Sequence, residues 1–178
     1  MTVASPSLTL RPTVRPDLPD VVAILRSTAD WYRPFVDPAD LESQHAVDLA
    51  WARENFERRE FWSATLNGEV VGVLTMQDAG DHLYLGYVYV HRDHVGKRIG
   101  RRLLDHAAAE ARRRGKEGLV LIAHPEATWA VRAYRKYGFE CVATTDDDVC
   151  EWNDGWLEPY HEQGFHLWRW TPEETPAC

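Results

Sequence analysis

Cysteine is scarce in this chain of 178 residues, where only Cys141, Cys150 and Cys178 occur. Their number is odd, and no two of them have the close spacing that is typical of a zinc knuckle. Small secreted domains that depend on disulfides carry a denser set. We therefore expect reduced thiols, with neither a disulfide framework nor a metal site.

Long apolar runs are also missing. No stretch approaches the roughly 20 apolar residues that cross a bilayer, and residues 1–8 lack the positive start and apolar core of a secretory signal. We expect a cytoplasmic protein with no membrane partner. The length fits one domain with a sizeable core. A single domain over residues 1–178 is therefore predicted, with flexible tails at residues 1–7 and 172–178.

The net charge is −8, but the basic residues are unevenly distributed. Residues 92–116 hold nine of the 20 Lys and Arg residues and three acidic residues, so this segment carries +6 and the rest of the chain −14. Such an island on an acidic protein favours a small anionic ligand over nucleic acid. Two alternatives stay open, namely a solvated helix face and DNA binding through Arg112, Arg113 and Arg114.

Hydrophobic periodicity predicts strands alternating with helices. Strands are expected at residues 8–14, 61–66, 70–76, 82–90, 119–123, 139–144 and 165–170, and helices near residues 18–25, 40–59, 99–114 and 126–137. The order predicts an α+β (mixed α/β) fold, with a central, mostly antiparallel sheet of about 6–7 strands, a β-α-β crossover and flanking helices. Residues 145–163 are expected to form a long loop.

A turn with two glycines follows the strand at 82–90. Gly96 and Gly100 relieve crowding where the strand passes into a helix, so backbone N–H groups at the helix start can converge on an anion. Arg98 and Arg101 can add full positive charges. Taken alone, these residues fit either a pyrophosphate site or an ordinary tight turn.

The residues around this turn resemble the coenzyme A motif of the GNAT N-acetyltransferases, in which an apolar-Tyr-Val strand end precedes Gln/Arg-x-x-Gly-x-Gly/Ala. Val88-Tyr89-Val90 matches the strand end and Gly100 the last glycine, whereas Val95 and Arg98 depart from the motif. We expect Arg98 to keep a negative φ, with its guanidinium along a phosphate. The resemblance implies acetyl-CoA as co-substrate, held by the strand end and the turn. These residues are Val88, Tyr89, Val90, Val95, Gly96, Lys97, Arg98, Ile99, Gly100 and Arg101.

Residues 121–139 resemble the second signature of the same family, a buried strand followed by Asn-x-x-Ala-x-x-x-Tyr-x-x-x-Gly-Phe. Tyr134, Gly138 and Phe139 fall in register, while Ala127 stands at the usual asparagine. The coenzyme contact of that asparagine is therefore either lost or taken over by Thr128, and the resemblance implies that Tyr134 contacts the coenzyme as well.

The resemblance also implies catalytic roles. Tyr134 would be the general acid beside the sulfur, and the backbone N–H of Val90 would hold the thioester oxygen. The base is less defined. His124 follows the buried strand and has a suitable reference pKa, while His91, Asp78 and a water chain remain alternatives.

The acceptor is predicted from aromatic and acidic residues outside the two signatures. Trp31 and Tyr32, in the helical region before residue 40, and Trp156, in the segment 145–163, are the candidate substrate-binding residues, because aromatic rings beside carboxylates favour a cationic amine. We expect N-acetylation of a small-molecule or peptide amine, with a homodimer as a plausible assembly. A non-catalytic acyl-CoA sensor or interaction module is the alternative.

Overall fold

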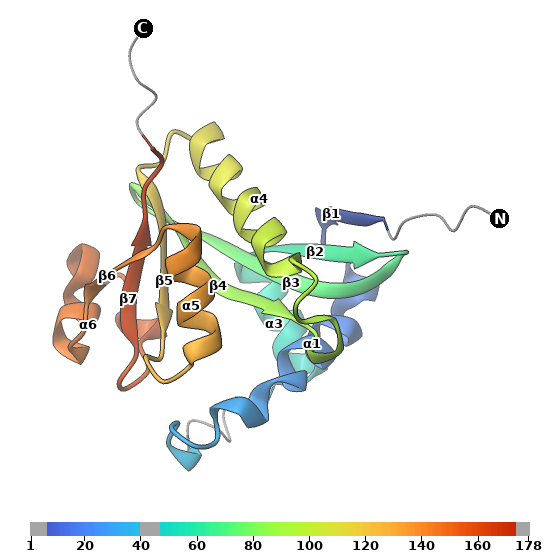
Figure 1. The fold of residues 1–178 in the computed structure, drawn as a ribbon, viewed down its shortest axis with the longest axis horizontal. Coiled ribbons are helices and arrows are strands. Elements are labelled where there is room, and N and C mark those ends of the chain that lie inside the picture. Colours follow the sequence, from blue (N-terminus) through green and yellow to red (C-terminus); the bar gives the residue numbers. More distant parts are fainter. Residues whose placement is uncertain (1–6, 40–46, 174–178) are drawn as a thin grey trace, which may run out of the picture. The chain divides into compact units, whose positions relative to one another are not determined.

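The computed structural model describes residues 7–39 and 47–173, and within these residues seven strands form one sheet in the order β1-β2-β3-β4-β5-β7-β6 (Figure 1). The strands are β1 (Leu8–Pro12), β2 (Glu60–Leu66), β3 (Glu69–Ala79), β4 (His82–Val90), β5 (Gly118–Ala123), β6 (Glu140–Ala143) and β7 (His166–Trp170). The α-helices are α1 (Leu18–Ser27), α3 (Leu49–Arg58), α4 (Ile99–Arg113), α5 (Thr128–Tyr137) and α6 (Asp146–Gly155). Among the described residues, 3-10 helices are η1 (Arg15–Asp17), η2 (Ala29–Tyr32), η3 (Arg92–His94) and η4 (Glu158–Tyr160).

The sheet is mixed. β1 with β2, β2 with β3, β5 with β7 and β6 with β7 pair antiparallel, whereas β4 and β5 run parallel, from His82 opposite Gly118 to Tyr84 opposite Val120. The β4-α4-β5 segment is therefore the crossover. The predicted fold class, a mostly antiparallel sheet with one β-α-β crossover and flanking helices, is confirmed.

The chain divides into two compact units. Unit 1 comprises residues 1–76 and 87–104, and unit 2 comprises residues 77–86 and 105–178. β3, β4 and α4 each contribute residues to both units. The single domain over residues 1–178 stays a prediction, and most of its two predicted tails lies outside the described residues, as does the first part of the helix predicted at residues 40–59.

In unit 1, α1 and α3 cover one side of the sheet. Their apolar side chains pack with those of β2 and β3 in a buried cluster of Val21, Ile24, Leu25, Val47, Phe61, Val70 and Val73. The start of α4 packs on β3 at Gly72. A Cβ added to Gly72 would lie 3.0 Å from Ile99 Cγ2 and 3.4 Å from Leu103 Cδ1. Gly72 therefore permits a close approach of α4 to the strand.

Unit 2 contains a helix where the sequence analysis predicts a loop. Residues 146–155 form α6, and the hydroxyl of Thr145 caps it by accepting from the N–H of Asp148 at 3.2 Å. Val149 and Leu157 are fully buried in the core of this unit. The predicted loop at residues 145–163 is therefore wrong. A threonine followed by three aspartates is a helix-start signal, but residues 152–154 leave the helical conformation and disrupt the apolar periodicity.

Among the described residues, no helix is long and apolar enough to span a bilayer.

An ion pair ties the end of β1 to the start of α1. The guanidinium of Arg11 donates to both carboxylate oxygens of Asp17, at 2.6 and 2.9 Å, and the N–H of Val14 donates to the same side chain. Asp17 is buried, and the bond from Arg11 is the largest cause that lowers its pKa.

Replacing Asp17 with Asn should lower the free energy of unfolding by about 2 kcal/mol, the range for hydrogen bonds to charged groups. Because the folded-state pKa of Asp17 is lowered, this stabilisation is present above the ordinary pKa of 3.8 and is lost as the pH falls through the folded value. Urea unfolding at neutral and acidic pH measures both effects.

The control is Glu57→Gln, which removes the partner of Arg15 at a site where both side chains are more than half exposed. Its cost should stay below about 1 kcal/mol. Equal losses in the two variants would contradict the role of the Arg11–Asp17 pair.

Candidate functional site

The end of β4 has backbone donors that point away from β3. The N–H of His91 donates to Val71 O at 2.8 Å, and the N–H of Tyr87 donates to the hydroxyl of Thr75 at 2.9 Å. Because backbone direction alternates along a strand, the N–H groups of Val88 and Val90 point to the opposite side. The N–H that the resemblance assigns to the thioester oxygen, that of Val90, therefore lies on the strand edge away from β3.

The side chains of this strand end divide between two faces. Tyr87 and Tyr89 pack on the cluster under α1 and α3, and the ring centroid of Tyr87 lies 5.5 Å from that of Trp51. Val90 lies on the other face, with its Cγ2 3.9 Å from the position of a Cβ on Gly100. Val90 therefore lies beside the first turn of α4.

The turn from Val95 to Gly100 contains two left-handed residues. Gly96 has φ of +87°, and Arg98 has φ of +61°. The expectation of a negative φ at Arg98 is therefore wrong. Ile99, which follows, is buried against Gly72 and sets the start of α4, so the backbone turns at Arg98 to reach it. A left-handed conformation costs a residue with a Cβ about 1–2 kcal/mol, so Arg98 is strained where the family motif has glycine.

Backbone N–H groups at this turn are available to an anion. At the start of the helix, the N–H of Arg102 donates to Arg98 O at 3.2 Å. Within the described residues, the N–H groups of Gly96, Arg98, Ile99 and Gly100 have no protein acceptor. N–H groups at the start of a helix, together with its dipole, favour a negatively charged group. This arrangement fits the phosphates of a coenzyme.

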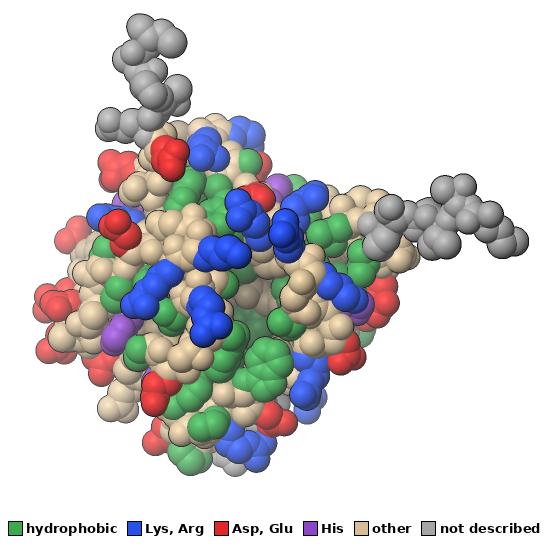
Figure 2. Space-filling model, viewed as in Figure 1, with side chains coloured by type: hydrophobic (Ala, Val, Ile, Leu, Met, Phe, Trp, Pro, Cys, Tyr) green, Lys and Arg blue, Asp and Glu red, His purple; other side chains and the backbone are tan. Residues whose placement is uncertain are grey.

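The basic island divides into two parts in the structure. Its second part makes intramolecular contacts: Arg112 lies 5.2 Å from the ring centroid of Trp170, Arg113 and Arg114 pair with Glu110, and Lys116 donates to Asp78 at 2.6 Å. The two arginines lower the pKa of Glu110 to about 2. Figure 2 shows Lys and Arg side chains gathered where Figure 1 draws α4 and the turn before it.

The first part of the island carries the cations of the turn. Lys97 Nζ lies 3.1 Å from His94 Nδ1, and Lys97, Arg98, Arg101 and Arg102 are exposed. These side chains, rather than Arg112 to Lys116, are the cations that can meet an anion at the start of α4.

Tyr134 lies in the last turns of α5, in unit 2. The N–H of Phe139 donates to Tyr134 O at 3.0 Å, and the N–H of Gly138 donates to Arg135 O at 3.1 Å. Gly138 has φ of +117°, so this is a Schellman motif. The rings of Tyr134 and Phe139 lie 5.6 Å apart, the apolar contact that often accompanies the motif. The Tyr-x-x-x-Gly-Phe spacing therefore ends the helix and orients the tyrosine ring.

At the other end of α5, Thr128 is the first helical residue and is exposed, while Ala127 is buried. No side chain caps this end. Contact of Thr128 with a coenzyme stays a prediction.

His124 is nearly buried, at 9% exposure, directly after β5. Its Nδ1 accepts from the N–H of Glu126 at 3.1 Å, and its ring packs edge-on against Phe165. Burial is the largest cause that lowers the pKa of His124 from 6.5. The ring is therefore neutral at pH 7 with its proton on Nε2, because Nδ1 acts as an acceptor.

The other two candidate bases have partners as well. Asp78 pairs with Lys116, which is the largest cause that lowers the pKa of Asp78. Nδ1 of His91 accepts from the N–H of Asp93 at 3.2 Å.

The candidate acceptor residues lie in two aromatic clusters, one in each unit. Trp31 and Tyr32 are half-buried at the end of η2, with Tyr32 5.7 Å from Phe35. Trp156 follows α6, and its ring centroid lies 5.3 Å from that of Tyr84 and 5.2 Å from that of Tyr160. Their role in binding an acceptor stays a prediction.

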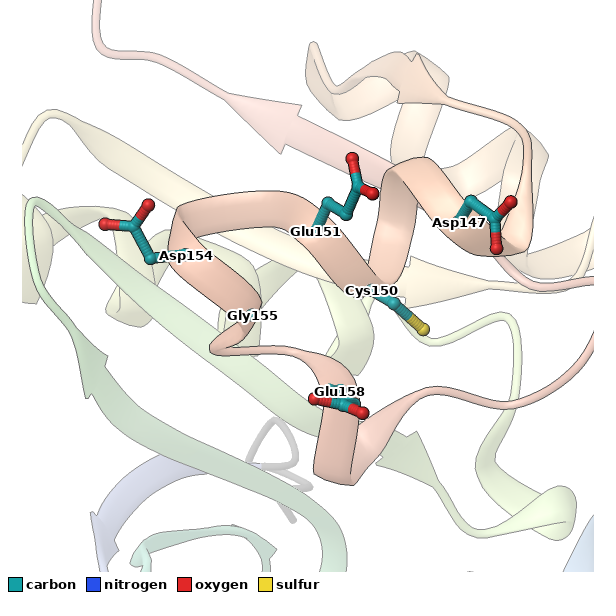
Figure 3. A pocket seen from close by; sticks show the side chains of 6 residues that line it. All are labelled: Asp147, Cys150, Glu151, Asp154, Gly155 and Glu158. Carbon is teal, nitrogen blue, oxygen red and sulfur yellow. The ribbon is translucent and has the colours of Figure 1, made fainter.

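A shallow hollow of about 460 Å³ on α6 is lined by acidic side chains (Figure 3). Its lining residues are Asp147, Cys150, Glu151, Asp154, Gly155 and Glu158. The carboxylates of Figure 3 point in different directions rather than to one centre. In the part of the chain that the structure describes, no three ligating side chains are grouped to hold a metal ion.

One pair of titratable residues in unit 2 is not indicated by any sequence pattern. Nε2 of His161 lies 2.9 Å from Oδ1 of Asp146, in unit 2. The residues are 15 positions apart and lie in the segment predicted as a loop, so no local spacing signal points to them.

Comparison with known proteins supports the interpretation of the turn and of α5. The family model described as Acetyltransferase (GNAT) family matches residues 25–139, which include both. A Xenopus tropicalis protein named "Probable N-acetyltransferase camello" is 31% identical over 130 residues, 69% of this chain. The chain spans 58% of the length of that relative.

Solved structures of low sequence identity share the fold. The PaiA N-acetyltransferase of Thermoplasma acidophilum, in complex with coenzyme A, gives a TM-score of 0.72 at 16% identity over 93% of this chain and 99% of that one. The yncA protein of Salmonella typhimurium, with acetyl-CoA, gives 0.63 at 21% identity over 97% and 98%.

The left-handed φ of Arg98 can be tested with two substitutions. Arg98→Gly removes the Cβ strain, whereas Arg98→Ala keeps it, so the glycine variant should be the more stable by about 1 kcal/mol. This order is the reverse of ordinary helix propensity. Thermal or urea unfolding measures it. An alanine variant as stable as the glycine variant would show that Arg98 is not strained.

Proposed function

Because the chain belongs to the acetyltransferase (GNAT) family, we propose that it moves an acetyl group from acetyl-CoA directly to a primary amine of a small molecule or peptide. The observation that carries this proposal is the start of α4, where backbone N–H groups and exposed cations converge inside the range that the family model matches. These groups suit a pyrophosphate.

The turn holds the coenzyme in this proposal. The N–H groups from Gly96 to Gly100 donate to the phosphates, and Lys97, Arg98 and Arg101 add positive charge. Gly100 leaves the backbone open to the ligand, since a Cβ there would meet only Val90 within 4 Å. Val88, Tyr89 and Val90 hold the arm that carries the acetyl group, and Thr128 adds a polar contact.

Acyl transfer needs a polarised carbonyl, a neutral amine and a proton for the leaving sulfur. The N–H of Val90 stabilises the negative charge that develops on the thioester oxygen. The hydroxyl of Tyr134 supplies the proton to the sulfur, and the packing of its ring on Phe139 keeps the hydroxyl oriented. The Nδ1 lone pair of His124 accepts a hydrogen bond from the N–H of Glu126. His124 can therefore act as the base only if this hydrogen bond opens.

Trp31, Tyr32 and Trp156 are proposed to bind the acceptor. Their rings offer cation–π contact to an ammonium group, and the acidic composition outside residues 92–116 attracts a cation.

A screen of amine acceptors, with the released coenzyme A thiol as the readout, tests the function. Turnover with at least one amine is expected. Binding of acetyl-CoA in calorimetry without turnover of any amine would favour the alternative of a non-catalytic sensor. That alternative is considered because Val95, Arg98 and Ala127 depart from the family motifs. Absence of binding would contradict both.

Gly100→Asp should weaken coenzyme A binding about tenfold or more, because its carboxylate repels the phosphates at short range. The fold should not suffer, since an acidic residue in the first turn of a helix is favourable. Gly100→Ala is the matched control. It should bind normally and raise the stability by about 0.5–1 kcal/mol. Calorimetry and thermal unfolding measure both, and equal affinities in the two variants would contradict the assignment of the turn.

Tyr134→Phe should lower kcat about 100-fold, the range for loss of a general acid, with unchanged coenzyme affinity because the ring still packs on Phe139. Tyr137→Phe is the control, since it removes a hydroxyl from the same helix, one that donates to Asp105, and it should keep the rate. An unchanged kcat in Tyr134→Phe would remove the tyrosine from the proton transfer.

A further inference from the structure

A histidine and an aspartate form a hydrogen-bonded pair near the amino end of β7. Oδ1 of Asp146 accepts from His161 Nε2 at 2.9 Å and from the N–H of Gly164 at 2.9 Å. The His161 side chain is 18% exposed. The N–H of Gly164 and then His161 lower the pKa of Asp146, so its carboxylate is charged at neutral pH. Two donors hold this carboxylate in one orientation.

The pair determines which nitrogen of His161 carries a lone pair. A carboxylate only accepts hydrogen bonds, so the ring proton lies on Nε2. Nδ1 is then the basic nitrogen, and within the described residues it has no hydrogen-bond partner. The charge of Asp146 stabilises the imidazolium that forms when Nδ1 takes up a proton, as a carboxylate does for histidine in hydrolase triads.

His124 has the opposite arrangement. Its Nδ1 already accepts from Glu126, and its proton lies on Nε2, so the ring presents a donor rather than a base. Of these two histidines, His161 therefore has the chemistry that proton removal requires.

His124 and the carboxylate of Asp146 both lie beside Gly164, at the carboxyl end of β5. Ala123, the last residue of β5, pairs with His166 of β7. Gly164, which donates to Asp146, lies so close to His124 that an added Cβ would be 3.4 Å from the ring Nε2. Ligands of sheets with parallel strands bind beyond the carboxyl ends of those strands, and β5 is parallel to β4.

We propose that His161, oriented by Asp146, is the proton acceptor for the amine, which deepens the proposed function and rests on it. Nδ1 of His161 removes one proton from the substrate ammonium. The freed nitrogen lone pair forms the C–N bond with the thioester carbonyl carbon while the C–S bond breaks, and Tyr134 gives its proton to the sulfur. The second proton lost by the nitrogen restores Tyr134, and His161 releases its own to water.

The test uses the full chain, acetyl-CoA and the panel amine with the highest turnover, and follows thiol release against pH. His161→Gln keeps an N–H donor for Asp146 but loses the base. This variant should lower kcat/KM about 100-fold and leave coenzyme affinity unchanged. Its rate should rise continuously with pH instead of reaching a plateau, because hydroxide then removes the proton. Imidazole added to His161→Ala should restore part of the rate, which a purely structural role would not allow.

Asp146→Asn keeps an acceptor for both donors and removes only the charge. Its rate should fall, because the imidazolium that forms on His161 during proton removal loses its counter-ion. The other titratable groups near the Asp146–His161 pair are His166 of β7, Glu158 of η4 and His124. His166→Gln is the matched control and should keep the rate and the pH profile of the unaltered protein.

Equal kcat/KM and equal pH profiles in His161→Gln and the unaltered protein would overturn the proposal. The proposal would also be overturned if His124→Gln removed the fall in rate at low pH. A His161→Ala variant that folds but is not rescued by imidazole would overturn it as well. Failure of the proposed function looks different, since the unaltered protein itself would then turn over no amine, which also removes the role of His161.

Discussion

The packing of Ile99 against Gly72 is the contact on which the rest of the candidate coenzyme site depends. Gly72 has no side chain, so Ile99 and Leu103 can approach β3 closely and the first turn of α4 is anchored by buried apolar groups. The chain leaves β4 at Val90 and has only the residues from His91 to Arg98 in which to reach that anchor. The direction of the backbone in this turn is therefore imposed by the packing after it, and the N–H groups that open α4 are held in place before any ligand arrives.

The strain at Arg98 follows from this anchor. Glycine would meet the same backbone requirement without cost, yet the chain has arginine there, in a left-handed conformation. Residues in such conformations persist where the surrounding structure over-determines them, and they cluster at functional sites. An exposed guanidinium at the start of α4 offers a reason for the substitution, because it adds a full charge beside the backbone donors.

The histidines of unit 2 show how hydrogen-bond partners divide chemical roles between similar residues. His124 accepts a hydrogen bond at Nδ1 from a backbone N–H, whereas His161 donates a hydrogen bond from Nε2 to a carboxylate. The first ring is left with a proton to donate and the second with a lone pair. Gly164 lies close to both, since a Cβ added there would be 3.4 Å from the ring of His124, and its N–H donates to the carboxylate that holds His161.

The sequence by itself determined the order of the elements, the crossover, and the placement of the turn and of Tyr134, because these depend on local periodicity and on spacing within one strand or helix. The Tyr-x-x-x-Gly-Phe pattern is a local device that closes its own helix, so its sequence suffices. Only the tertiary structure decided the φ of Arg98, the partners of Arg112 and Lys116 and the pairing of Asp146 with His161. Each depends on a residue distant in the chain, such as Gly72, Trp170 or Gly164, whose position local spacing does not reveal.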